Sequence, residues 1–414
     1  MHTFTLIFIV CLATSLLLQL WLATRHLKYV KDHSDIVPPA FAEKISLEAH
    51  HKAAEYTQVK TRFERIGLFI GTLLLLFWTL GGGLNWLDQF WLSFGYSTIV
   101  TGIAFLLSLI VITTLLDIPL SIYSTFYIEQ RFGFNRTTSA IFMTDLLKQM
   151  ALTLIIGTPL IALVLWLMQN AGTYWWFYVW LVWTGFGLLM MWAYPAFIAP
   201  LFNKFTPLDE GSLRQRINSL LTRCGFKSNG IFVVDGSRRS GHGNAYFTGL
   251  GANKRIVFYD TLINSLNEDE IEAVLAHELG HFKRKHIIKR ILLMMTTTLI
   301  GLMVLGWLIK QNWFYTGLGV EQPSIHAALA LFMMVAPVFT FFIAPVSSYF
   351  MRKHEFEADD YAAQQSNAGF LIDALVKMYK ENASTLTPDP LYSAFHDSHP
   401  PAAIRIAHLN TQGA

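Results

Sequence analysis

Long apolar stretches alternate with polar loops along the chain, and their lengths indicate repeated membrane crossing. A helix that spans the hydrocarbon core of a bilayer, roughly 30 Å thick, needs about 20 apolar residues. Windows of this kind, free of Asp, Glu, Lys and Arg, occupy residues 4–23, 66–86, 96–116, 150–168, 174–202, 291–309 and 325–350. The pattern predicts seven transmembrane helices. We interpret the first as an uncleaved anchor, because its apolar core exceeds the roughly 7 to 15 residues of a signal peptide.

The composition supports a membrane protein. Of the 414 residues, 53% are hydrophobic and 14% are charged, whereas soluble domains carry about 25% charged residues. The net charge of +3 is too balanced for a nucleic-acid-binding surface, so we expect the lipid bilayer as a partner and no nucleic acid. Only two cysteines occur, which excludes a disulfide framework.

Basic residues are confined to alternate loops, and this predicts the topology. Segments 25–65, 131–148, 204–290 and 352–405 contain 8, 3, 14 and 5 Lys or Arg, which is 30 of the 31 in the chain. Because loops rich in Lys and Arg stay in the cytoplasm, we predict a multi-pass protein with its N-terminus outside and its C-terminus cytoplasmic. A bacterial cytoplasmic membrane and the endoplasmic reticulum membrane both fit this topology.

Two cytoplasmic loops are long enough to fold. In the first, an amphipathic surface helix is predicted from Pro38 and Pro39 to Val59. The loop of residues 203–290 has a helical pattern at 213–223, followed by β-rich runs at 230–235, 244–249 and 255–259. We expect these runs to form a three-stranded antiparallel unit.

The chain therefore divides into four predicted regions. Residues 1–202 carry five transmembrane helices with their loops, and residues 203–290 form a cytoplasmic region that contains the sequence HELGH. Residues 291–350 carry the last two spans, and residues 351–414 return to the cytoplasm. The predicted fold class is mainly α, a seven-helix transmembrane bundle with a small cytoplasmic α+β domain.

A helix with a clear start carries the candidate chemistry. Asn267 can cap it, and Glu270 stands at the capping-box position. Farther along, His277 and His281 are spaced i, i+4, so both imidazoles project from one face and can bind one Zn²⁺. Glu278, one residue after the first histidine, is placed to act as general base on a metal-activated water.

The third metal ligand must come from elsewhere, because no short metzincin spacing follows. The last two spans cross the membrane twice and return the chain to the same face, near an acidic segment. There Glu355 and Asp359 are spaced i, i+4, which suits Glu355 as an oxygen ligand and Asp359 as the acceptor that orients an imidazole. Glu357 remains the alternative ligand. We expect His286, beside the basic run 283–285, to be exposed.

Ordered motifs along most of the chain resemble a known family. They are the triplets Tyr127-Ile128-Glu129 and Gly133-Phe134-Asn135, the run Pro200 to Leu208, Asn244-Ala245-Tyr246-Phe247, HELGH, HEFEAD at 354–359 and Ser398-His399-Pro400-Pro401. The set resembles the type I CAAX prenyl proteases, integral-membrane zinc metalloproteases that are more distantly similar to bacterial heat-shock membrane metalloproteases.

The resemblance implies roles by position. It matches the metal ligands to His277, His281 and Glu355, the catalytic carboxylate to Glu278 and the orienting aspartate to Asp359. It also implies that Asn244 and Arg405 bind substrate and that His399 is catalytic, with one Zn²⁺ per chain. Seven helices around a water-filled chamber would be capped by the protease domain. Two prolines follow His399 and fix its backbone, so in such a protein its ring could donate to the oxyanion of a tetrahedral intermediate. Without the resemblance, the residues favour a capped loop histidine at His399 and an ion pair of the tail at Arg405.

The leading hypothesis is a membrane zinc endopeptidase that cleaves near the cytoplasmic face and removes C-terminal residues of peptide or protein substrates, prenylated or otherwise membrane-anchored. One alternative is a quality-control metalloprotease without prenyl specificity. An alternative of another class is a transporter with a structural zinc site.

Overall fold

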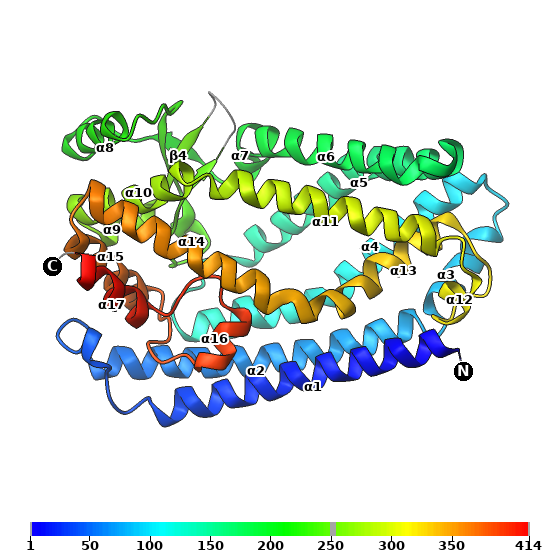
Figure 1. The fold of residues 1–414 in the computed structure, drawn as a ribbon, viewed down its shortest axis with the longest axis horizontal. Helices are drawn as coiled ribbons and strands as arrows, with labels where there is room; N and C mark the ends of the chain where they lie inside the picture. Colours follow the sequence, from blue (N-terminus) through cyan, green and yellow to red (C-terminus); the bar gives the residue numbers. More distant parts are fainter. Residues whose placement is uncertain (1, 249–253, 413–414) are drawn as a thin grey trace.

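Long helices lie side by side through most of the molecule (Figure 1). The computed structural model describes residues 2–248 and 254–412. Its long apolar helices are α1 (Thr3–Asp32), α2 (Leu47–Trp78), α4 (Thr98–Tyr123), α5 (Ser139–Asn170), α6 (Trp175–Ala193), α11 (His286–Leu308) and α13 (Ile325–Thr340). Six spans satisfy length and composition on their own, and α2 with α3 (Gly83–Leu92), bent by 48°, makes a seventh. The predicted seven-helix bundle is confirmed at this level.

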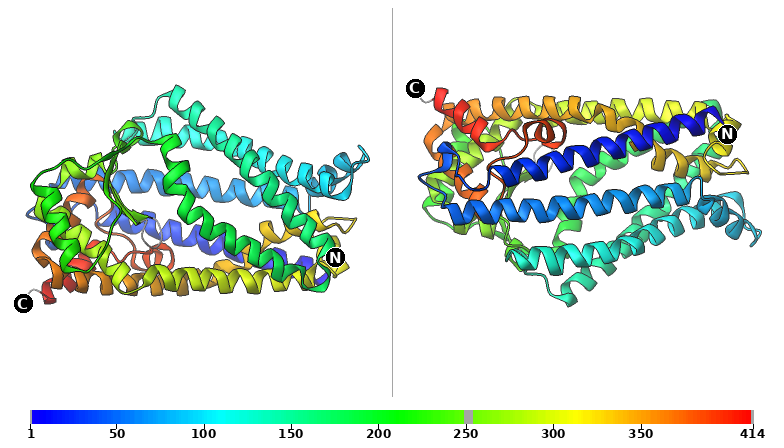
Figure 2. Two further views of the ribbon diagram at one scale, coloured as in Figure 1. Left: turned by 90° about the horizontal axis from the view of Figure 1, so that it is seen from above. Right: turned by 90° about the horizontal axis from the view of Figure 1, so that it is seen from below.

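The long helices pack in a series of neighbours. Successive contacts join α2 to α1, α1 to α13, α13 to α11, α11 to α6, α6 to α5 and α5 to α4. Figure 2 shows α1 and α2 in front of the other long helices in the view from below. The two termini lie at opposite ends of the bundle (Figure 1), as an odd number of crossings requires.

Several spans continue beyond the apolar windows. A π-helical turn at Ser124–Glu129 extends α4, and another at Tyr194–Ile198 links α6 to α7 (Ala199–Phe202). A 3-10 turn at Phe341–Ile343 links α13 to α14 (Ala344–Gln365). The seventh span thereby runs directly into the acidic segment.

The loop between the first two spans differs from the prediction. The chain forms a short 3-10 turn at Pro39–Phe41, and α2 begins only at Leu47, where the side chain of Ser46 accepts a hydrogen bond from the backbone N–H of Ala49. Because α2 then continues to Trp78, the predicted surface helix is the first half of α2 and not a separate element.

The far end of the bundle, near the N-terminus, has its own packed core. Short turns at Gly172–Tyr174 and α12 (Asn312–Thr316) close the loops there. Buried apolar residues from α1, α3, α4, α5, α12 and α13 meet in one cluster, among them Phe8, Leu84, Phe105, Leu165, Phe314 and Leu331. This packing joins the first, middle and last spans at one end.

A four-stranded sheet lies at the opposite end. Its strands are β1 (Phe205–Pro207), β2 (Ile231–Val234), β3 (Ala245–Thr248) and β4 (Arg255–Tyr259), in the order β1-β2-β4-β3. The predicted antiparallel three-stranded unit is wrong, because β2 and β4 are parallel and β1 adds a fourth strand. Only the β3–β4 pair among the predicted runs is antiparallel. Gly249, at the end of one predicted run, lies outside the described residues.

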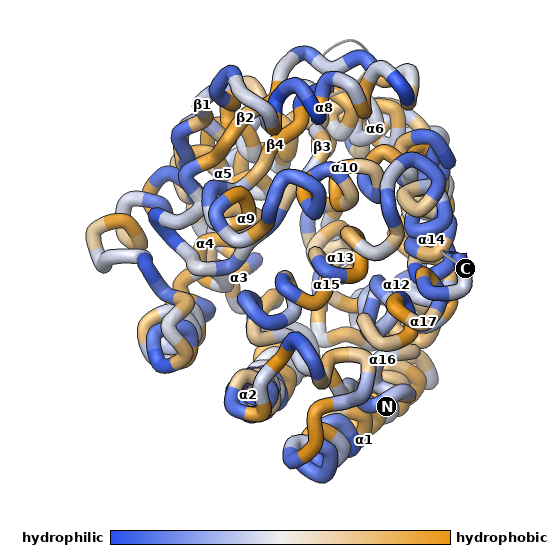
Figure 3. Tube along the Cα trace, turned by 90° about the vertical axis from the view of Figure 1, so that its left-hand side faces the viewer, coloured by the Kyte–Doolittle hydropathy of each residue, from blue (hydrophilic) through white to orange (hydrophobic). Residues whose placement is uncertain are grey.

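Further helices lie with the sheet at this end of the molecule (Figure 1). They are α8 (Ser212–Arg223), α9 (Asp260–Ser265), α10 (Glu268–Lys283), α15 (Ala368–Glu381), α16 (Pro390–His396) and α17 (Ala402–Gln412). Their core includes Ile217, Phe258, Leu275 and Leu375. Seen from this end, hydrophilic segments are frequent around α8, α9 and α15 (Figure 3). The four region boundaries drawn from the sequence stay a prediction.

Candidate metal centre

The helix that carries HELGH is held at its start by a capping box. The side chain of Asn267 accepts a hydrogen bond from the backbone N–H of Glu270, and the Glu270 carboxylate accepts one from the backbone N–H of Asn267. These two bonds satisfy backbone donors that a helix start otherwise leaves unpaired. The predicted start of α10 is confirmed.

A close helix crossing places α10 against α14. A side chain at Gly280 would put its Cβ 2.9 Å from Cα of Ala358 and 3.0 Å from the carbonyl oxygen of that residue. Real Cβ atoms do not approach backbone atoms so closely, so only glycine permits this separation. The glycine within HELGH therefore brings the two helices close enough to share one site.

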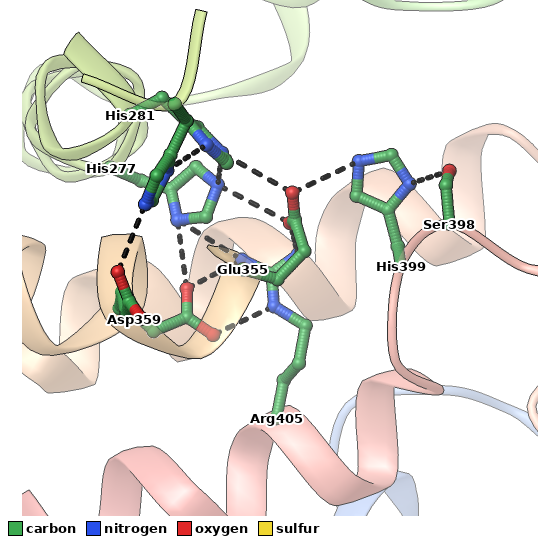
Figure 4. A network of polar contacts seen from close by, with 9 residues as sticks. His277, His281, Glu355, Asp359, Ser398, His399 and Arg405 are labelled. Atoms are coloured by element: carbon green, nitrogen blue, oxygen red, sulfur yellow. Dashed lines mark hydrogen bonds and ion pairs between the residues drawn. The ribbon is translucent and has the colours of Figure 1, made fainter. Parts of the chain in front are cut away.

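Three ligand-type side chains converge at this crossing (Figure 4). Nε2 of His281 lies 3.2 Å from Nε2 of His277 and 3.2 Å from Oε1 of Glu355. One ligand atom from each residue can be chosen so that all three lie within 4.8 Å of one another. The HELGH spacing and the return of the chain through the seventh span together produce this arrangement.

An unpaired carboxylate oxygen in this cluster fits a metal ion. Oε2 of Glu355 is buried and has no hydrogen-bond partner within residues 2–248 and 254–412, and buried polar atoms are seldom left unpaired. Burial and the charge of Arg405 lower the pKa of His277, but Asp359 and Glu355 outweigh them and raise it to about 9. The surroundings therefore favour a positive charge between the imidazoles and the carboxylate, and two histidines with one carboxylate form a donor set suited to Zn²⁺.

A buried ion pair lies behind His277. Nδ1 of His277 is 2.8 Å from Oδ1 of Asp359, whose side chain is fully buried. Arg405, from α17, donates to both carboxylate oxygens of Asp359 at 2.8 and 2.6 Å, and its Nη1 is 3.6 Å from Oε2 of Glu355. The predicted orienting partner, Asp359, thus contacts His277, and Arg405 neutralises the carboxylates from behind.

The other acidic candidate, Glu357, points elsewhere. Its Oε2 lies 3.0 Å from Nε2 of His286, and Nδ1 of His286 lies 3.0 Å from Nδ1 of His281. The expectation that His286 is exposed is wrong, because only 5% of its side chain is accessible. The sequence reasoning missed this residue, and the pairing of HELGH with a histidine five residues later was the available signal.

The remaining predicted site residues lie around the cluster. Glu278 is half-buried on α10, next to the first histidine. His399 is 64% exposed, with Nε2 at 3.5 Å from Oε1 of Glu355 and Nδ1 at 3.0 Å from the Ser398 hydroxyl. Asn244 is exposed and directly precedes β3, whose outer edge pairs with no strand in the described part of the chain.

A helical membrane bundle that carries a HELGH helix, with a glutamate from a second helix completing its ligand cluster, defines an integral-membrane metalloprotease. Comparison with known proteins agrees. Residues 26–204 match the family model "CAAX prenyl protease N-terminal, five membrane helices", and residues 207–412 match "Peptidase family M48". The chain belongs to the type I CAAX prenyl protease family.

Similar proteins cover nearly the whole chain. CAAX prenyl protease 1 homolog of Arabidopsis thaliana is 36% identical over 396 residues, which are 90% of each chain. CAAX prenyl protease 1 of Saccharomyces cerevisiae is 35% identical and covers 92% of this chain and 90% of its own. The crystal structure of S. mikatae Ste24p matches with a TM-score of 0.92 at 33% identity over 99% of both chains. The protein is a CAAX prenyl protease-like, multi-pass membrane metalloprotease, and the transporter alternative has no support.

Proposed function

We propose that this protein is a zinc endopeptidase that removes C-terminal residues from prenylated or otherwise membrane-anchored substrates at the cytoplasmic face. The observation that carries the proposal is the convergence of His277, His281 and Glu355 beside Glu278 at one end of a membrane bundle. A site at the end of transmembrane helices suits a peptide whose terminus is held in the bilayer. Each buried CH₂ of a lipid anchor contributes about 0.8 kcal/mol to membrane binding, so the membrane itself concentrates such a substrate.

The proposed chemistry assigns one task to each side chain. His277, His281 and Glu355 hold a single zinc ion, which when bound supplies a Lewis acid and acidifies a water molecule. The carboxylate of Glu278 accepts the proton of the attacking water and donates it to the leaving amine. Asp359 keeps Nδ1 of His277 protonated through its 2.8 Å hydrogen bond, so that Nε2 remains free to bind the metal.

Three further residues receive roles around the reacting bond. His399 is exposed and 3.5 Å from Glu355, so its ring is available to donate to the oxyanion of the tetrahedral intermediate. Asn244 opens the free edge of β3, where an extended substrate can add as a strand. Arg405, matched by the resemblance to a substrate-contacting residue, is buried against Asp359 and Glu355. We assign it a positioning role.

The activity is tested with purified protein and a Glu278→Gln variant. Because general acid–base catalysis contributes about 10² to 10⁴ in rate and the metal ligands are untouched, the variant should lose cleavage by that factor and keep one zinc per chain. A zinc chelator should inactivate the wild type. Substantial hydrolysis by Glu278→Gln would remove the general-base assignment.

The substrate class is tested with three peptides. One CAAX peptide is supplied with and without its prenyl group, alongside an unrelated membrane-anchored peptide. We expect both CAAX forms to be cut, the prenylated one faster. If the enzyme readily cleaves the unrelated peptide but neither form of the CAAX peptide, a quality-control protease is favoured.

The proposed orientation places the protease end in the cytoplasm. Its support is the alternation of basic loops, together with the position of the termini at opposite ends of the bundle (Figure 1). In a variant without Cys11 and Cys224, a cysteine at Asn312 should react with an impermeant reagent in intact cells, whereas one at Ser398 should require permeabilisation. Labelling of Ser398 in intact cells would reverse the topology.

A further inference from the structure

The chain turns sharply between the helix that carries HELGH and the sixth span. Lys285, between α10 and α11, has φ 59° and ψ 29°, the left-handed conformation that non-glycine residues rarely adopt. In a continuous helix, a residue five positions after His281 would point about 140° away from it. The turn at Lys285 instead brings His286, the first residue of α11, back against His281.

His286 is held by contacts on both sides of its ring. Its Nδ1 lies 3.0 Å from Nδ1 of His281, and its Nε2 lies 3.0 Å from Oε2 of Glu357. The ring of His354 stacks on it, with centroids 4.0 Å apart and planes 15° apart. A buried imidazole with both nitrogens engaged and one face covered has a defined orientation.

The hydrogen bonds define a single direction for the protons. His281 presents Nε2 to His277 and Glu355, so its Nδ1 carries the proton when Nε2 binds a metal. That N–H donates to Nδ1 of His286, which must then be the unprotonated nitrogen of a neutral ring. Nε2–H of His286 in turn donates to the carboxylate of Glu357, which only accepts.

We propose that His286 and Glu357 are positioning residues that fix the tautomer and ring orientation of His281, as Asp359 does for His277. The inference rests on the proposed zinc site and deepens it. It also gives separate functions to the two glutamates of the HEFEAD segment. Glu355 faces the histidines of HELGH, whereas Glu357, two residues later, faces the partner of one of them.

Zinc affinity of the purified full-length protein tests this proposal. Zn²⁺ is titrated in competition with a chromophoric chelator, using the variants His286→Ala, Glu357→Ala and the double variant. Loss of a residue that orients a metal ligand typically weakens metal binding about 10- to 100-fold, and we expect that range for each single variant. Because Glu357 acts only through His286, the two losses should not add. The double variant should bind Zn²⁺ no more weakly than the single variant that has the lower affinity.

Two control variants separate positioning from a general structural effect. Glu357→Gln keeps an acceptor oxygen and should retain most of the affinity. His408→Ala removes a histidine–carboxylate pair between α17 and α14, in which Nε2 of His408 lies 2.6 Å from Oδ1 of Asp360, and should leave zinc binding unchanged. The absorption spectrum of the Co²⁺-loaded protein should change in His286→Ala and Glu357→Ala, because the ligand field depends on the ring orientation of His281.

The outcomes distinguish the two proposals. If the wild type binds no zinc, or if His281→Ala binds it as tightly as the wild type, the proposed site itself is wrong. If the wild type binds zinc and both single variants match it, or if their losses multiply in the double variant, the coupled arrangement is wrong. Should His286→Ala fail to fold, Glu357→Ala carries the test, because its side chain is 31% exposed.

Discussion

The two histidines of the candidate metal centre have different surroundings. Behind His277 lies a charged pair, in which the side chains of Asp359 and Arg405 are 0% and 8% exposed. Behind His281, itself 21% exposed, lies a neutral imidazole that leads to a partly exposed carboxylate. Removing one partner of a buried ion pair is destabilising because it leaves the other charge buried and uncompensated. We therefore expect substitutions behind His277 to lower the stability of the fold, and substitutions behind His281 to lower mainly the metal affinity.

The largest effect is expected from Asp359→Ala. The substitution leaves the buried guanidinium of Arg405 without its main partner, and breaking a buried ion pair costs about 3–5 kcal/mol. Thermal or denaturant unfolding of the zinc-free protein in detergent measures this loss. The neighbouring Asp360→Ala, whose side chain is 32% exposed, is the matched control and should cost less than about 1 kcal/mol. Equal unfolding stability of both variants would show that the ion pair behind His277 is not important for the fold.

A second comparison concerns the two glutamates of α14. Glu355→Gln removes a proposed ligand and should abolish cleavage. It should weaken Zn²⁺ binding by more than the roughly 100-fold that loss of an orienting partner can cause. Glu357→Gln should change both quantities little. Zinc titration and peptide cleavage measured on the same preparations decide between them, and the opposite pattern would assign the metal to Glu357.

Gly280→Ala tests the helix crossing on which both sides depend. The added methyl group meets the backbone of Ala358, and overpacking of this kind costs about 1–3 kcal/mol. We expect lower unfolding stability together with weaker zinc binding, because α14 must move away and take Glu355 with it. Gly187→Ala, where the new methyl group meets no atom within 4 Å among the described residues, should have neither effect.

The smallest effect is expected at the turn that places His286. A non-glycine residue in the left-handed region costs about 1–2 kcal/mol, and glycine relieves this strain while adding entropy to the unfolded chain. Lys285→Gly should therefore keep zinc affinity and change unfolding stability by less than about 1 kcal/mol. Lys285→Val, whose β-branched side chain fits this conformation poorly, should reduce both. Wild-type affinity in Lys285→Val would show that the turn does not control His286.

Features that depend on neighbours along the chain were predictable from the sequence. The transmembrane helices could be predicted from single apolar windows, because each span must cover the same hydrocarbon thickness. The capping box of Asn267 and Glu270 and the shared face of His277 and His281 follow from spacing within one helix. The family was also identifiable, since its motifs occur in a fixed order along the whole chain.

Features that depend on packing were decided only by the tertiary structure. The parallel pairing of β2 with β4 could not be predicted from the apolar and polar residues of either strand. That pattern indicates which face of a strand is buried but not the direction of the neighbouring strand. Spacing on α14 left both Glu355 and Glu357 available as ligands, and the position of α10 across it separates them. The burial of His286 depends on one left-handed residue, Lys285, whose conformation no local preference predicts. The left-handed conformation of Lys285 is maintained because α10 and α11 are each held by their own packing. The residue between them must adopt a backbone conformation that connects the two helix axes.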